Sequence, residues 1–210
     1  MAFLGDEPPA PWCLPVNVCT MHDSTQLLLR KVLNSTHEKV TEGDTSEVLY
    51  PLPDFTPTDE GVRVNPEAIS FCRVDYSPPM ISAVIEGIRK GVVPELDRLY
   101  FLDDQFNLAR AGLQSTVSVL ENCRIFACER SWAVWSVLDV GLRYIRSLVE
   151  EASYPSQDEV VFPQPSKEIC GLNKLLIELA FPVYEKIGEF YIVFFTEIHF
   201  PCVETTFIGM

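Results

Sequence analysis

The hydrophobic pattern of this chain changes near residue 77, and that change constrains the fold more than any other feature of the sequence. Before it, prolines and β-branched residues dominate and apolar side chains tend to alternate along the chain, as in strands with one buried face. After it, apolar residues return every three or four positions, as in helices packed on one side. The two patterns in succession predict an α+β protein in two parts.

Four short segments of the first part have the composition of strands. They are residues 12–19, 26–33, 47–52 and 69–74. In the first, every second residue from Trp12 to Val18 is apolar, whereas the second carries apolar side chains on both faces, which leaves a short helix as the alternative. Residues 53–66 are rich in Pro, Asp and Thr and are predicted to be a loop. Short strands joined by turns predict a small β-sandwich over residues 1–76.

Five helices are predicted in the second part, over residues 78–91, 95–112, 116–127, 132–151 and 172–187. Pro78 marks a helix start, because a proline in the first turn sacrifices no hydrogen bond. Gly91 and Gly112 are expected helix ends, and Pro182 is expected to kink the last helix. Consecutive helices with short connections predict a HEAT/armadillo-like repeat domain over residues 77–188, with a helix bundle as the alternative. Residues 189–210 fit neither part and are treated as a divergent tail.

Composition excludes several classes of function. The 210 residues include 30 acidic and 16 basic side chains, for a formal net charge of -14 at pH 7. Nucleic acids and anionic lipids both require clustered Lys and Arg, so neither is an expected partner. No apolar run reaches the roughly 20 residues of a membrane span, and the first twelve residues do not resemble a secretory signal. Seven cysteines without a C-x-x-C pair are typical of reduced thiols and predict a cytoplasmic protein.

Few residues are suited to a zinc site. The chain has three histidines, at positions 22, 37 and 199. His37 and Glu38 begin like the H-E-x-x-H motif, in which two imidazoles one helical turn apart bind the same zinc ion. Thr41 occupies the place of the second histidine. We therefore interpret this partial match as coincidence.

The adjacent carboxylates of Asp103 and Asp104 are a second candidate metal site. Such a pair binds magnesium when a diphosphate completes the coordination shell, and the segment resembles the aspartate pair of terpene cyclases. The third acidic residue of that pattern is missing here. The favoured interpretation is structural, with both residues serving as polar or dipole-complementing positions of a helix.

Two further groups in the helical part have both a functional and a structural interpretation. Trp132 and Trp135 lie three residues apart and suit either a stacked ligand or a helix core, of which the core is favoured. Five arginines are expected to be solvated or paired with nearby acidic residues. They are Arg110, Arg124, Arg130, Arg143 and Arg146.

Several segments resemble the C-terminal portion of the M1-family zinc aminopeptidases. Residues 96–112 (LDRLYFLDDQFNLARAG) are similar to the start of the C-terminal helical domain of that family, and residues 71–76 (FCRVDY) resemble the strand that precedes it. Residues 132–138 and 12–16 resemble a later helix and an earlier sandwich strand of the family. The puromycin-sensitive and endoplasmic-reticulum aminopeptidase branch is the most similar, so residues 77–188 resemble its C-terminal domain in shortened form.

The resemblance implies a non-catalytic role. In that family the zinc ligands, substrate clamp and transition-state tyrosine precede the β-sandwich, so we expect no catalytic, cofactor-binding or metal-ligating residue in this chain. The expected function is that of the C-terminal region of a peptide-trimming zinc aminopeptidase, inactive by itself and capping or gating the active site. The alternative is a stand-alone helical-repeat module that binds peptides or a full-length paralogue. A third hypothesis is a magnesium enzyme using Asp103 and Asp104.

Overall fold

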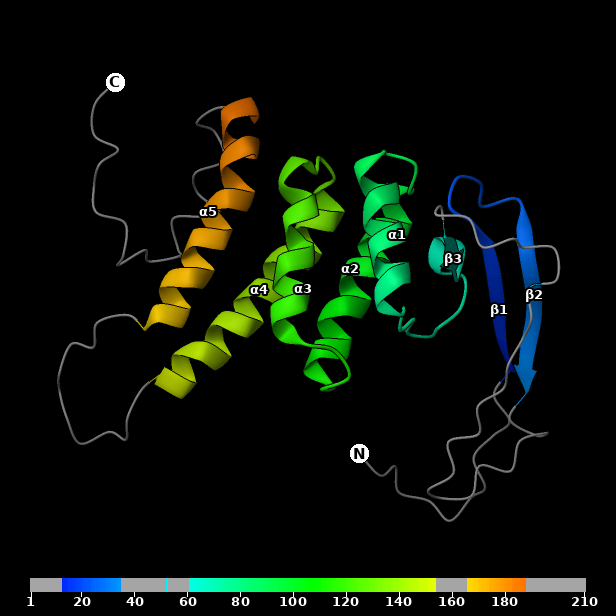
Figure 1. Ribbon diagram of the computed structural model, residues 1–210, viewed down its shortest axis with the longest axis horizontal. Coiled ribbons are helices and arrows are strands. Elements are labelled where there is room, and N and C mark those ends of the chain that lie inside the picture. Colours follow the sequence, from blue (N-terminus) through cyan, green and yellow to red (C-terminus); the bar gives the residue numbers. More distant parts are fainter. Residues whose placement is uncertain (1–12, 35–51, 53–60, 154–165, 188–210) are drawn as a thin grey trace, which may run out of the picture. The chain divides into compact units, whose positions relative to one another are not determined.

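The computed structural model of the protein describes residues 13–34, 52, 61–153 and 166–187 (Figure 1). The described strands are β1 (Cys13–Thr20), β2 (Leu27–Asn34) and β3 (Val62–Val64). The described helices are η1 (Pro66–Ala68), α1 (Pro78–Arg89), α2 (Glu95–Arg110), α3 (Thr116–Asn122), η2 (Cys123–Cys128), α4 (Trp132–Ser153) and α5 (Lys167–Ile187). The chain divides into two compact units, Met1–Asp97 and Arg98–Met210. The mixed α+β class is thus confirmed, whereas the predicted boundary at residues 76 and 77 stays a prediction.

The first unit contains an antiparallel sheet with the strand order β2-β1-β3. Leu14 lies opposite Leu33, and Val18 lies opposite both Leu29 and Val64. These pairings confirm the first two predicted strands and rule out the helix alternative for the second. The described residues contain only this one sheet, so the predicted β-sandwich is not confirmed.

Two predictions about the remaining strands are wrong. β3 lies within residues 53–66, which composition assigned to a loop, and residues 69–74 form no strand. The reason lies in the turn between them, where Asn65, Glu67 and Ala68 have φ angles of 55°, 59° and 51°. The predicted strand at residues 47–52 lies outside the described residues except for Leu52, which is not in a strand.

Side chains hold this turn in its left-handed conformation. The side chain of Asn65 donates to the carbonyl oxygen of Ser70 at 2.8 Å and accepts from its N–H at 2.9 Å. The hydroxyl of Ser70 in turn donates to the carbonyl oxygen of Pro15 on β1. Positive φ is costly for residues other than glycine, so these bonds compensate the strain of the turn, and the Ser70 bond holds its end beside β1.

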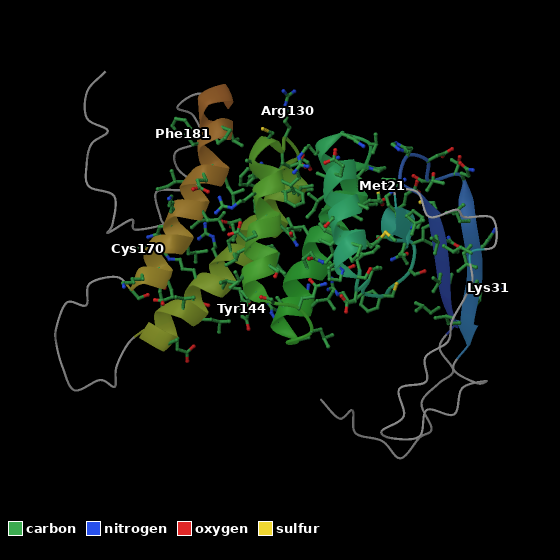
Figure 2. All side chains as sticks on the ribbon, viewed as in Figure 1. Met21, Lys31, Arg130, Tyr144, Cys170 and Phe181 are labelled. Carbon is green, nitrogen blue, oxygen red and sulfur yellow. The ribbon has the colours of Figure 1, made fainter. Side chains whose placement is uncertain are left out.

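Helix α1 packs against the sheet unit through small residues. Met21 is buried, and it lies against Gly87 of α1 and near Gly61, which precedes β3 (Figure 2). Helix α1 begins at Pro78, as predicted, and Gly91 follows its end with a φ of 72°. That left-handed conformation is open to glycine without a steric penalty.

The second unit has a core of apolar residues from α2, α3, η2, α4 and α5. Its most deeply buried members are Leu102, Val119, Cys123, Phe126, Val134, Leu138, Leu142 and Leu179. The helix predicted at residues 116–127 is shorter, because it continues as the 3-10 helix η2, and α5 continues through Pro182. Leu113 lies beyond the end of α2 and is exposed. The predicted HEAT-like repeat is not confirmed by these helices.

Candidate functional site

The two candidate magnesium ligands of α2 do not converge. Asp104 is 5% exposed and faces the core, whereas half-buried Asp103 accepts at 3.0 Å from the side-chain amide of Asn107. The side chains of neighbouring residues in a helix point in directions about 100° apart, so the two carboxylates face different surroundings. This geometry favours the structural interpretation over a magnesium site.

No group of three or more His, Cys, Asp and Glu side chains within the described ranges is arranged to bind a metal ion. His22 is exposed in the turn after β1. His37 and His199 lie outside the described residues. His22, the histidine among the described residues, is therefore not part of a zinc site there.

Burial makes two cysteines poor nucleophiles. Burial raises the pKa of the Cys123 thiol to about 12. It also raises the pKa of Cys19, although the guanidinium of Arg63 acts in the opposite direction. The thiolate is the reactive form of cysteine, so at neutral pH these two side chains act as small apolar core residues.

The two tryptophans of α4 have different environments. Trp135 is half-buried, and its indole N–H donates to the carbonyl oxygen of Glu129 at 3.1 Å. Trp132 is 62% exposed, so the expectation that both belong to the core is wrong for Trp132. It lies at the first position of α4, before the helix has completed a turn against the core.

The acidic residue of the Leu96-Asp97-Arg98 motif forms a buried ion pair in the first unit. Arg63 of β3 pairs with Asp97, and both side chains are almost completely buried. Arg63 also donates to the carbonyl oxygen of Thr20 and to the hydroxyl of Ser24. The second oxygen of Asp97 accepts from the N–H of Glu67 at 2.6 Å. The pair thereby fastens β3 and its turn to the first turn of α2.

The basic residue of the same motif has a separate partner in the second unit. Arg98 donates to Glu129 through Nε at 2.7 Å and through a terminal nitrogen at 3.0 Å. Glu129 also accepts from the N–H groups of Arg130 and Ser131 at 2.8 and 2.9 Å, where α4 begins. Burial raises the pKa of Glu129, but these hydrogen bonds outweigh burial and hold it below its usual range. The first interaction joins β3 to α2, and the second joins α2 to the segment that leads into α4.

The sequence singled out neither Arg63 nor Glu129. The signal for Arg63 was a charged residue between two valines of a short strand, since a charge is seldom buried without a partner.

The arginines that were expected to pair do so in three cases. Arg124 contacts Glu121 and Glu178, Arg143 contacts Asp139, and Arg146 contacts Glu150.

One face of α4 carries an exposed apolar stripe. Val140, Tyr144 and Leu148 recur at intervals of four residues, and all three side chains are exposed. The guanidinium carbon of Arg110 lies 3.9 Å from the centre of the Tyr144 ring, which is the geometry of a cation–π contact. Exposed apolar residues in a continuous row often mark an interaction surface. We define this row as the α4 stripe.

Comparison with known proteins identifies the helical region. Residues 62–191 match the family model described as the ERAP1-like C-terminal domain. A glutamyl aminopeptidase of Bitis rhinoceros is 30% identical over 149 residues, which cover 65% of this chain and 15% of that protein. A puromycin-sensitive aminopeptidase of Caenorhabditis elegans is 24% identical over 150 residues, which cover 71% of this chain and 15% of that protein.

An aminopeptidase N of Plutella xylostella is similar over a shorter region, with 24% identity over 127 residues. That region covers 60% of this chain and 12% of the relative. The matched part is therefore a small fraction of the length of each of these curated relatives. Within the described residues, no helix combines the length and the apolar character needed to cross a membrane.

Proposed function

The chain belongs to the family of ERAP1-like C-terminal domains, and from this premise we propose that it forms a non-catalytic C-terminal part of an M1-family zinc aminopeptidase. The observation that carries the proposal is the extent of the family match, which spans β3 and all five described α-helices. The similarity to aminopeptidases of three kinds supports peptide N-terminal trimming as the activity of the whole enzyme.

In this proposal the chain supplies no catalytic group. Catalytic zinc usually takes three protein ligands, and H-E-x-x-H provides two of them one helical turn apart. The three histidines of this sequence are 15 and 162 residues apart, and Asp103 and Asp104 diverge. Zinc would therefore be bound by residues outside this chain, where it would polarise the peptide carbonyl and activate water.

The proposed role of the helical unit is to cover the active site and to limit which peptides reach it. Covering elements exclude water and select substrates without taking part in bond cleavage. The α4 stripe offers a surface on which a peptide or a neighbouring domain would pack.

The purified chain should contain no stoichiometric zinc and should release no N-terminal residues from peptides or from aminoacyl chromogenic substrates. Metal analysis and an activity assay with added zinc test this, and a full-length relative serves as the positive control. One zinc ion per chain together with aminopeptidase activity would overturn the proposal of an inactive part.

A chimera tests the gating role. Residues 62–187 would replace the matched region of a glutamyl aminopeptidase. We expect the chimera to cleave a single-residue chromogenic substrate, which shows that it is folded, but to prefer peptides of a different length from the parent enzyme. An unchanged length preference in an active chimera would contradict a role in substrate selection.

The exposed α4 stripe also favours a second candidate function, a stand-alone module that binds peptides or a full-length paralogue. The intact mass of the native species that contains residues 101–112 separates the two. A species several times heavier than 23.7 kDa supports the enzyme part, whereas a species of that mass supports the module. For either function we propose a cytoplasmic location from the cysteine usage, which cell fractionation would test.

A further inference from the structure

Two hydrogen bonds show which backbone groups of β1 face away from β2. The carbonyl oxygen of Asn17 accepts from the N–H of Asn65 at 2.8 Å, and that of Pro15 accepts from the hydroxyl of Ser70. Pro15 also has no N–H to donate. In an antiparallel ladder, opposite residues exchange either both hydrogen bonds or neither. Pro15 and Asn17 therefore form non-hydrogen-bonded pairs with their partners on β2.

Those partners are Val32 and Arg30. Because their pairs with β1 are not hydrogen-bonded, the N–H and C=O groups of Val32 and Arg30 point away from β1. The strand order β2-β1-β3 puts β2 at the edge of the sheet, and no residue that the structure places is paired with that edge. Val32 is 59% exposed, and Arg30 and Lys31 are exposed as well. Among the described residues, the outward backbone donors and acceptors of Arg30 and Val32 therefore have no strand partner, and the Arg30 and Lys31 cations lie beside them.

The cations select what can pair with this edge. In a second copy of the chain, the register that pairs Arg30 with Val32 places the two Lys31 side chains directly opposite each other, which is destabilising. Arg30 and Lys31 are adjacent and lie on opposite faces of the strand. An incoming strand therefore satisfies both when it carries two consecutive acidic residues. Apolar residues on either side of these would lie opposite Leu29 and Val32.

We propose that the edge of β2 binds an extended acidic segment of a partner protein as an added antiparallel strand. The recognised pattern is apolar–acidic–acidic–apolar. Backbone hydrogen bonds to Arg30 and Val32 provide affinity, and the two cations provide selectivity, as in other cases of strand addition. This site lies in the first unit and precedes the matched family region, so it does not depend on the proposed function.

The test uses the full chain and a capped hexapeptide of sequence TVEEVT, with the charge-reversed peptide TVKKVT as the control. We expect the acidic peptide to slow hydrogen exchange at the amides of Arg30 and Val32, with an affinity that falls as salt increases. The lysine peptide should have no such effect. Binding measured by calorimetry and residue-resolved exchange by NMR provide two independent readouts.

Two variants separate binding from folding. Val32→Pro removes an outward N–H and no bond to β1, so the sheet should stay folded while the affinity falls about tenfold, as expected for one lost hydrogen bond. The double variant Arg30→Glu and Lys31→Glu should reverse the preference and bind TVKKVT. Circular dichroism verifies that both variants are folded.

Three results would overturn the proposal. Equal binding of the two peptides would exclude charge selection. Slow exchange at both amides without peptide, independent of protein concentration, would show that the edge is already covered within the chain, for example by acidic residues 35–60. Protection that rises with protein concentration would show that a second copy occupies it.

Discussion

Gly141 allows α4 to lie directly against the aromatic ring of Phe106. A Cβ atom built on Gly141 would overlap the ring of this buried phenylalanine on α2. On α5, by contrast, a Cβ atom built on Gly171 would meet nothing within 4 Å. Both glycines are within helices, so the two positions differ in their packing and not in their backbone.

We therefore expect opposite effects from the same substitution. Gly141→Ala should destabilise the protein by about 1–3 kcal/mol through overpacking, net of any gain in helix propensity. Gly171→Ala should stabilise it by up to about 1 kcal/mol, because alanine is the better helix former. Urea unfolding midpoints of the two variants measure this. A Gly141→Ala protein as stable as the Gly171→Ala protein would contradict the close contact between α2 and α4.

Glu129 connects the start of α4 to Arg98 through a charged hydrogen-bond network. Its pKa is lowered in the folded protein from an ordinary value of 4.5. The folded state then binds fewer protons than the unfolded state near that pH, so the contribution of Glu129 to stability is present above about pH 4.5. It is lost as the pH falls through the lowered pKa.

Glu129→Gln should therefore cost about 1–3 kcal/mol at pH 7, the value of hydrogen bonds to charged groups. The difference between wild type and variant should shrink as the pH is lowered from 5 to 3. Denaturant unfolding across this pH range measures the change, and Asp139→Asn, in an exposed ion pair, is the control with little effect. A difference that does not vary with pH would show that the carboxylate charge is not involved.

Helix α4 has one buried apolar face and one exposed apolar face. Leu138, Leu142 and Ile145 are buried, whereas the α4 stripe of Val140, Tyr144 and Leu148 is exposed. The buried face is the one that the helical spacing of apolar residues predicts. The exposed face shows that apolar character alone does not decide burial, since half or more of a protein surface is apolar.

Leu142→Ala should cost about 2–5 kcal/mol because it creates a cavity in the core. Val140→Ala, two residues away on the same helix, should change the free energy of unfolding by no more than about 0.5 kcal/mol. Thermal and urea unfolding of both variants measure this difference. A large loss from Val140→Ala would mean that the stripe is covered in solution.

The whole molecule is strongly acidic, with a formal net charge of -14 at pH 7. Association with nucleic acid depends on basic side chains that displace counterions from phosphates. Of the five arginines singled out in the helical part, Arg124, Arg143 and Arg146 pair with acidic residues and Arg110 contacts a tyrosine ring. The net negative charge of the chain therefore disfavours association with nucleic acid.

We expect the protein not to retard double-stranded DNA or RNA in gel-shift assays at low salt, where electrostatic binding is strongest. A basic protein of similar size serves as the positive control. Retardation that disappears with added salt would reveal a basic surface that neither the composition nor the described ion pairs indicate.

Some strands and helices are predicted by the pattern of the residues that form them. The alternation of residues 12–19 predicted β1, and Pro78 and Gly91 predicted the ends of α1. Periodic apolar residues predicted α2 and α4. These signals are local because backbone geometry sets the period of a strand or helix. The resemblance of residues 96–112 also indicates the family, and the family match confirms it.

Only the tertiary structure decided features that depend on a distant partner. The turn at Asn65 ends the strand tendency of residues 69–74 because Ser70 bonds to Pro15, 55 residues away. Asp97 and Arg98 are neighbours in sequence, yet each is paired with a different residue, Arg63 or Glu129. The outward backbone groups of β2 likewise follow from its register with β1. Pairing over such distances is set by which surfaces meet on folding, which the period of a segment does not encode.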